Sequence, residues 1–255
     1  MSILSSVLLL VVSLALMAGG SVFLINETRI SEQSVSLVQS KGVAEVGIAQ
    51  ALESWDPRTA TRVRSGLYLV NRSGLGLLVR LKPVTFPEAA LIAGGSITLA
   101  PGARVDGVQD SGATSQRLVG DLDLARVSDL ADLTVPGGRY GLLPAVPGDG
   151  VLHIVGDAEV GGGSGTGVLL VDGDLTVTGP LTFNGLIVVR GKLLVSGSGI
   201  SNTHLSGSVV TVTGTTGDSS LWISYDKTLL DKVLSKFGTP EKLPSRSWTS
   251  LSQWG

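Results

Sequence analysis

The stretch VLLVDGDLTV, residues Val168–Val177, decides the fold, because the chain repeats its pattern. It aligns without gaps on ALIAGGSITL at Ala90–Leu99 and on LIVVRGKLLV at Leu186–Val195, and Leu152–Val160 is a looser copy. Each unit is typical of a strand, a turn that contains glycine and a second strand with alternating apolar residues. Internal repetition of this kind indicates stacked supersecondary units.

A single unit of this size cannot bury its own apolar face, so the units must stack on one another. Stacking predicts a right-handed parallel β-solenoid with short coils over residues 89–225, in which Val, Ile and Leu point inward and glycine takes the corners. Coils stack about 4.8 Å apart, so about five or six coils would form a rod of about 25–30 Å. Gln109–Gly150 interrupts the pattern and reads as an insertion or an excursion between coils.

The composition agrees with short strands joined by tight turns. The 255 residues include 35 glycines but only 4% aromatic residues, and glycine is the residue that tight turns favour. Nineteen basic residues nearly balance 21 acidic ones, and the net charge of -2 argues against a dominant nucleic-acid-binding surface. The chain has no cysteine, which excludes disulfides, thiolate metal sites and cysteine nucleophiles.

One segment precedes the expected solenoid in the sequence and another follows it. Residues 56–88 read as a linker followed by a β-hairpin, because two apolar runs surround a turn-rich segment. Residues 226–255 read as a C-terminal helix and cap, with Asp226 as the N-cap of the helix and Gly238 after its end. We expect this helix to cover the end of the solenoid, where strand edges would otherwise be unpaired.

Residues 1–55 are predicted to form one long helix, of which residues 1–25 form the membrane or filament-core part. Ile3–Leu24 carries no charge, and a helix of that length spans about 33 Å, close to the hydrocarbon core of a bilayer. A cleaved secretory signal would need a positive segment before the apolar run, and none is present. Glu27–Trp55 continues with apolar residues at helical spacing and ends just before Pro57.

This N-terminal segment resembles the type IV pilin family, and within it the PilX-type minor pilins. The resemblance rests on MSILSSVLLLVV at residues 1–12 and on GVAEVGIAQAL at residues 42–52, and it covers about the first fifth of the chain. It implies a prepilin-type leader that is removed in front of Met1. Pilins usually carry Glu as the fifth mature residue, whereas this chain has Ser5, which is typical of minor or tip subunits.

The resemblance implies an α+β structural protein with no enzymatic activity and no cofactor, assembled into a pilus-like filament with the β-solenoid exposed. The implied partners are copies of the chain or other pilins, the inner membrane before assembly, the prepilin peptidase and the assembly platform. The implied location is an extracellular filament at the cell surface, with an inner-membrane precursor pool. The residues expected to act in assembly are Met1, Ile3, Ser5, Leu8, Val12, Gly19, Gly20 and Phe23.

Two other functions are left open by the sequence. One is a minor or tip adhesin whose solenoid binds DNA or a glycan, with Arg58, Arg62 and Arg64 as candidate ligand contacts; the overall charge disfavours nucleic acid. The other is a membrane-anchored, polysaccharide-active β-helix enzyme, which would need a cleft with clustered carboxylates. The tryptophans Trp222 and Trp248, with Trp254, are interpreted as anchors for a partner or as caps of the solenoid.

Charged side chains near the expected turns are the candidates for chemistry. Stacked turns would bring together Asp157, Asp172, Asp174, Arg190 and Lys192. A charge ladder that supports stacking is the favoured interpretation, and Asp172-Gly173-Asp174 lacks the full ligand set of a calcium site. His153 and His204 show no Ser/His/Asp or zinc-ligand spacing in the sequence. We therefore predict no catalytic, metal or cofactor site.

Overall fold

The computed structural model of the chain describes residues 46, 49–50, 52, 60–64, 67–72, 75–197, 202–242 and 248–250. The chain divides into two compact units, which are Met1–Trp55 with Leu69–Leu78 and Pro244–Gly255, and Asp56–Tyr68 with Val79–Leu243. No helix in the described ranges is both long enough and apolar enough to cross a membrane.

Most of the expected N-terminal helix lies outside the described residues. Val46, Ala49, Gln50 and Leu52 are described, and all four are helical. The expected assembly residues lie outside the described residues, and they are Met1, Ile3, Ser5, Leu8, Val12, Gly19, Gly20 and Phe23.

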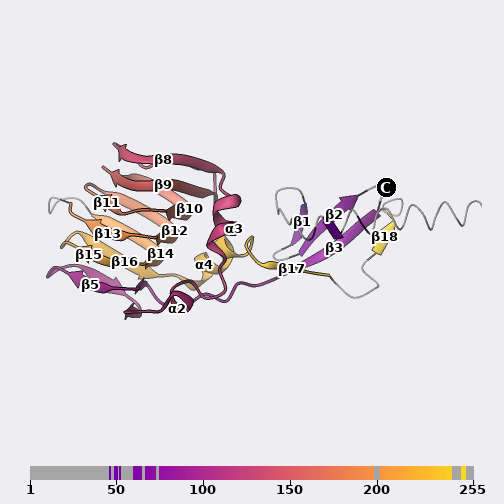
Figure 1. Cartoon of the computed structure of the whole chain (residues 1–255), viewed down its shortest axis with the longest axis horizontal. Coiled ribbons are helices and arrows are strands. Elements are labelled where there is room, and N and C mark those ends of the chain that lie inside the picture. The colour runs from indigo at the N-terminus through magenta and orange to yellow at the C-terminus, as the bar shows by residue number, and fades with distance from the viewer. Residues whose placement is uncertain are drawn as a thin grey trace, which may run out of the picture. The chain divides into compact units, whose positions relative to one another are not determined.

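A small sheet precedes the solenoid in the chain and is completed by C-terminal strands. Its members are β1 (Thr61–Arg64), β2 (Leu67–Arg72), β3 (Leu75–Lys82), β17 (Thr239–Lys242) and β18 (Trp248–Ser250). Strands β2 and β3 are hydrogen-bonded neighbours, in the region where the sequence predicts a hairpin. The end of β3 pairs antiparallel with β17, with Lys82 opposite Thr239. The chain therefore enters and leaves the solenoid along one two-stranded ribbon (Figure 1).

The rest of the described chain is a parallel β-solenoid, as predicted (Figure 1). Its 13 strands are β4 (Leu91–Ala93), β5 (Ser96–Leu99), β6 (Arg104–Asp106), β7 (Gln109–Ser111), β8 (Leu133–Tyr140), β9 (Val151–Val160), β10 (Gly163–Val171), β11 (Leu175–Val177), β12 (Leu181–Val189), β13 (Lys192–Val195), β14 (Thr203–Thr211), β15 (Gly214–Gly217) and β16 (Leu221–Tyr225). The right-handed winding stays a prediction.

The strands stack into three faces. Face 1 has the order β8-β9-β10-β12-β14-β4-β7, face 2 the order β8-β9-β11-β13-β15-β5, and face 3 the order β10-β12-β14-β16-β6. The long strands β10, β12 and β14 turn from face 3 into face 1 at Gly167, Gly185 and Gly207, which are paired in register and all have positive φ. A side chain at such φ values is strained, so glycine is required at this corner.

The strand register confirms the sequence repeat. Val168 pairs with Leu186 and Leu175 pairs with Leu193, as the gapless alignment requires. The expectation of five or six coils is too low, because seven strands stack on face 1. The coils that the sequence repeat did not reveal are those of β7 and β8, which lie within Gln109–Gly150.

The first coil in the sequence stacks after the last one. Strands β4, β5 and β6 pair with β14, β15 and β16, respectively. The segment from Gly112 to Asp132, with helices α2 (Ser115–Val119) and α3 (Leu124–Asp129), then leads to β8 at the opposite end of the stack. The expected excursion is therefore shorter than Gln109–Gly150, because β7 and β8 both belong to the solenoid.

Face 1 is buried on both sides. Its inward residues, such as Leu169 and Ile187, join the core inside the solenoid. Its outward residues, such as Leu170 and Val188, form a second core with apolar side chains of α2, α3 and α4 (Lys227–Leu234). Strands buried on both sides read as continuous apolar runs, which explains VLLV at Val168–Val171.

The C-terminal helix α4 forms where the sequence placed it. The Asp226 carboxylate accepts a hydrogen bond from the backbone N–H of Leu229 at 2.9 Å, which is the expected N-cap. Leu230 and Val233 are buried in the second core. The helix therefore packs on face 1 instead of covering the end of the solenoid, because the outward apolar residues of that face need cover.

Candidate functional site

The aspartates at the corner between faces 1 and 2 bind the backbone of the next coil. Asp157 Oδ1 accepts from the N–H of Asp174 at 2.8 Å, and Asp174 Oδ1 accepts from the N–H of Lys192 at 2.7 Å. A Cβ on Gly173 or Gly191 would lie 2.1 Å from these carboxylate oxygens. These two carboxylates join the coils through hydrogen bonds to the backbone, whereas the expected pairing of opposite charges occurs between Asp172 and Arg190.

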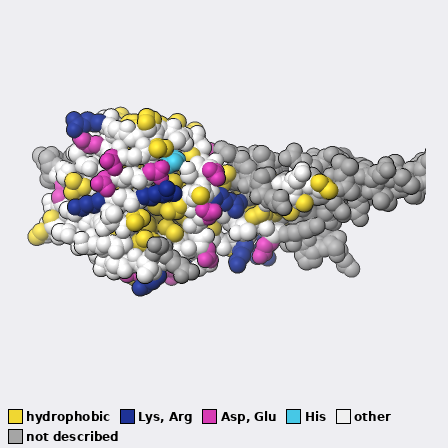
Figure 2. Space-filling model, in the orientation of Figure 1, with side chains coloured by type: hydrophobic (Ala, Val, Ile, Leu, Met, Phe, Trp, Pro, Cys, Tyr) yellow, Lys and Arg dark blue, Asp and Glu magenta, His cyan; other side chains and the backbone are white. Residues whose placement is uncertain are grey.

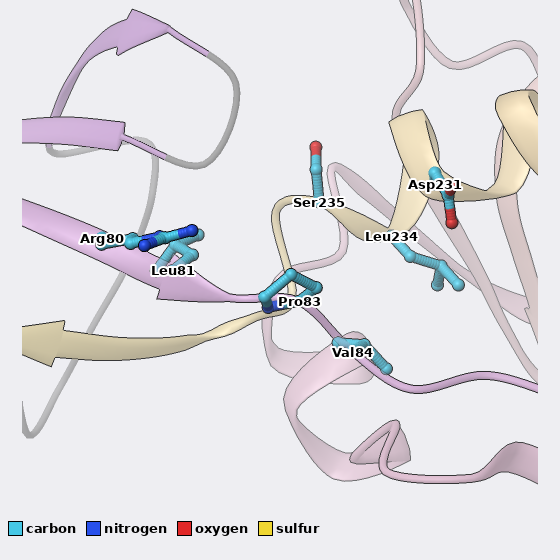
Figure 3. A pocket seen from close by; sticks show the side chains of 7 residues that line it. All are labelled: Arg80, Leu81, Pro83, Val84, Asp231, Leu234 and Ser235. Atoms are coloured by element: carbon cyan, nitrogen blue, oxygen red, sulfur yellow. The ribbon is translucent and has the colours of Figure 1, made fainter.

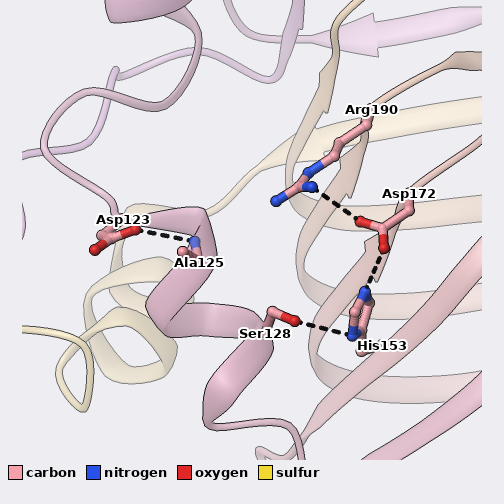
Figure 4. Close-up of polar contacts among 6 residues, drawn as sticks. All are labelled: Asp123, Ala125, Ser128, His153, Asp172 and Arg190. Carbon is pink, nitrogen blue, oxygen red and sulfur yellow. Dashed lines mark hydrogen bonds and ion pairs between the residues drawn. The ribbon is translucent and has the colours of Figure 1, made fainter.

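A second polar group lies where α3 packs on face 1 (Figure 4). His153 Nε2 lies 2.8 Å from Asp172 Oδ2, and His153 Nδ1 lies 3.1 Å from the Ser128 hydroxyl. Arg190 Nη1 lies 3.3 Å from the other oxygen of Asp172. The His153 side chain is buried. The sequence did not reveal this Ser–His–Asp chain, because Ser128 lies on the helical excursion and meets His153 only in the folded protein.

The contacts among Ser128, His153 and Asp172 differ from those of the catalytic triad in a serine hydrolase. There the nucleophile contacts Nε2 of the histidine and the carboxylate contacts Nδ1, whereas here Ser128 contacts Nδ1 and Asp172 contacts Nε2. In the tautomer that donates its Nε2–H to Asp172, Nδ1 accepts a hydrogen bond from the Ser128 hydroxyl. The arrangement ties α3 to two coils of the solenoid.

His153→Ala is expected to loosen α3. The substitution removes the hydrogen-bond partner of Asp172 Oδ2 and of the Ser128 hydroxyl, and an unsatisfied group in such a site costs about 1–3 kcal/mol. We expect faster amide hydrogen exchange in Leu124–Asp129. His204→Ala is the matched control, because His204 lies on face 3, and it should leave exchange in α3 unchanged. Equal rates of amide hydrogen exchange in α3 of the two variants would contradict the inference that His153 holds α3 on the solenoid.

Face 3 carries an aromatic and charged cluster. The rings of His204 and Trp222 stack with centroids 4.2 Å apart, and the Arg104 guanidinium lies 5.3 Å from the Trp222 ring on the next coil. The indole N–H of Trp222 donates to Asp106 at 2.9 Å, and Arg104 Nε donates to the same carboxylate at 2.8 Å. Trp222 therefore joins three coils through its neighbours, although its side chain is partly exposed.

Trp222 fluorescence should report the ionisation of Asp106. Hydrogen bonds from Arg104 and then Trp222 hold the pKa of Asp106 below its ordinary value. A lowered folded-state pKa means that the contribution of these hydrogen bonds persists above the unfolded-state pKa and is lost as pH falls through the folded-state value. We expect the difference in fluorescence between the parent and Trp222→Phe to titrate with a midpoint below 3.8. In Asp106→Asn this titration should disappear; an unchanged midpoint there would assign it to another group.

The surface formed by the described residues of the second unit is hollowed in several places. One hollow, of about 320 Å³, lies between the end of β3 and α4 and is lined by Arg80, Leu81, Pro83, Val84, Asp231, Leu234 and Ser235 (Figure 3). Another, of about 440 Å³, lies on face 3 and includes Asp149, Ser164, Thr166 and Asn184. The described residues contain no group of three or more His, Cys, Asp or Glu side chains placed to hold a metal ion.

The residues expected to contact a ligand are only partly described. Arg62 and Arg64 belong to β1, and Arg58 lies outside the described residues. Trp248 belongs to β18, and Trp254 lies outside the described residues.

Comparisons of the chain with protein-family models, with curated proteins and with solved structures find no match. The class that the fold defines is a parallel β-solenoid with an added second core on one face. Assignment to the type IV pilins stays a prediction.

Proposed function

We propose that the chain is a structural subunit of a type IV pilus-like filament, of the PilX-type minor class, that displays its β-solenoid outside the cell. The observation that carries the proposal is the uncharged run Ile3–Leu24 with its amphipathic continuation to Trp55. An apolar helix of this length is held in a bilayer before assembly. In a filament, small and branched apolar side chains of the same helix can pack against neighbouring copies.

The polar clusters of the solenoid support a structural role. The carboxylates of Asp157 and Asp174 accept hydrogen bonds from backbone N–H groups of the next coil, and His153 links α3 to the sheet. Figure 2 shows acidic and basic side chains interspersed over the viewed surface of the solenoid. Such a surface keeps a displayed domain soluble without a large field of one sign.

The proposal is tested by shearing surface filaments from cells that produce the protein and probing them with an antibody against the solenoid. We expect the parent chain in the filament fraction. Val12→Asp should reduce its amount there more than tenfold, because an aspartate near the centre of an inserted helix costs about 2.5–3.5 kcal/mol.

Val155→Asp is the matched control, because Val155 is 49% exposed on the solenoid. It should reach the filament fraction as the parent does. Recovery of the parent chain only in the soluble fraction, or equal filament signals from the parent and Val12→Asp, would contradict the proposal.

A further inference from the structure

The two ends of the solenoid differ in how their strand edges are protected. At one end, β8 contains Pro136, which has no N–H to donate, and its pairing with β9 shifts register between Pro136 and Gly138. The Tyr140 hydroxyl donates to the carbonyl of Pro136. Proline, bulges and capped carbonyls prevent further strand pairing at an edge. This end cannot add another coil by regular pairing.

The opposite end of face 2 lacks these features. Strand β5 is the terminal strand of that face, and it contains no proline, no charge and no register shift. The N–H of Ala100 donates to Gly217 on β15. Because backbone groups alternate sides along a strand, Thr98 also faces β15, and the N–H and C=O groups of Ile97 and Leu99 face the open edge.

The side chains of the same two residues carry the inner core to this end. Ile97 and Leu99 pack against buried residues inside the solenoid but are themselves only half-buried. Inward residues of the preceding coil, such as Leu221 and Ile223, are almost fully buried. The end at β5 thus presents unpaired backbone groups together with exposed apolar core surface, which marks an interaction site.

We propose that this end binds the same end of a second copy of the chain, with the two β5 strands antiparallel about a two-fold axis. A second β5 supplies what the edge lacks, namely backbone donors and acceptors next to apolar side chains. Head-to-tail stacking would need the edge of β8, which Pro136 and the register shift block. A self-complementary contact at one end closes as a dimer, whereas a head-to-tail contact would continue as a fibre.

The charges at this end permit the contact. Arg104 and Asp106 of β6 form an ion pair at 2.8 Å, and Asp110 of β7 pairs with Arg117 at 3.0 Å. Each copy therefore brings neutralised pairs to the contact, so the two ends do not repel each other. The contact uses the solenoid alone, and it goes beyond the proposed assembly through the N-terminal helix.

The pairing predicts a specific distance. With Ile97 opposite Leu99 of the second copy, each Thr98 faces the Thr98 of the other copy as a non-hydrogen-bonded pair, with Cα atoms about 4.5 Å apart. That separation lies within the range that a disulfide bridges, about 4.4–6.8 Å. The chain has no cysteine of its own, so a single Thr98→Cys substitution reports only this contact.

The experiment is oxidation of the full-length Thr98→Cys chain in membranes, followed by non-reducing electrophoresis. We expect most of the chain as a disulfide-linked dimer. Thr134→Cys is the matched control, because Thr134 is an exposed threonine on the edge strand β8 at the other end; it should stay monomeric. Adding Ile97→Lys to Thr98→Cys should reduce the linked dimer at least tenfold, because a charge is placed in the contact.

Three results would overturn the proposal. The first is no more linkage in Thr98→Cys than in Thr134→Cys. The second is linkage that appears only when chains carrying Thr98→Cys and chains carrying Thr134→Cys are mixed, which would show head-to-tail stacking. The third is full linkage in the presence of Ile97→Lys, with Leu99→Lys as a second variant and protease resistance as the check that each variant folds.

Discussion

Replacing Gly185 by alanine is expected to lower the free energy of unfolding of the solenoid by more than about 3 kcal/mol. A Cβ at this position would lie 2.0 Å from the carbonyl oxygen of Gly167 on the preceding coil, and Gly185 has φ +140°. The atom that it would meet belongs to the backbone, so no side-chain rotation can relieve the contact. A Cβ at Gly207 would likewise lie 2.0 Å from the carbonyl oxygen of Gly185. A shift of the backbone at Gly185 would therefore also displace the coil at Gly207.

The measurement is denaturant unfolding followed by pulse proteolysis of the solenoid. Gly141→Ala is the matched control, because a Cβ at Gly141 would meet no atom within 4 Å, and it should change the free energy of unfolding by less than about 0.5 kcal/mol. Equal unfolding midpoints for the two variants would show that the coils are not in contact at Gly185.

Leu170→Ala is expected to destabilise the solenoid as much as Leu169→Ala, by about 2–5 kcal/mol each. The two neighbours point to opposite sides of face 1, yet both have 0% exposure. Leu169 lies in the core inside the solenoid, and Leu170 lies in the second core beneath the helices. The equality of the two losses is specific to a face that is covered on both sides.

Thermal and denaturant unfolding of the two variants would be compared with Val155→Ala. Val155 is 49% exposed, so its truncation should cost less than about 0.5 kcal/mol. A loss for Leu170→Ala as small as that for Val155→Ala, with Leu169→Ala strongly destabilised, would mean that the helices do not cover face 1.

The repeat could be predicted because equivalent positions in stacked coils have the same environment. Val168 and Leu186 occupy paired positions on face 1, and Leu175 and Leu193 occupy paired positions on face 2, so residues of one type recur. The Asp226 cap could also be predicted, because capping depends on residues within one turn of the helix.

The coil that begins at Ser208 does not align on the apolar repeat, because polar residues replace apolar ones at its buried positions. Ser208 donates to the carbonyl of Ala89, and the hydroxyls of Thr211 and Thr215 lie 3.0 Å apart. Buried hydroxyl groups are tolerated when they are hydrogen-bonded. These partners become visible only when the coils are stacked.

The order of the coils is not encoded in a local pattern. Units with the same apolar pattern can pair with any other such unit, so the sequence alone does not place Leu91 beside Val209. The burial of face 1 on both sides is indicated by the apolar run VLLV, because a strand with one exposed face would alternate apolar and polar residues. The hydrogen bonds that link Ser128, His153 and Asp172 could not be predicted from the sequence, because the three residues belong to separate elements.

The proposed role as a filament subunit is tested most directly by mass spectrometry of the N-terminal peptide of the protein isolated from native cells. We expect a peptide that begins at Met1 with a methylated amine, as removal of a prepilin-type leader would leave it. A chain that continues unprocessed in front of Met1, or one that begins after Ala18 as cleavage of a secretory signal would leave it, would contradict the role.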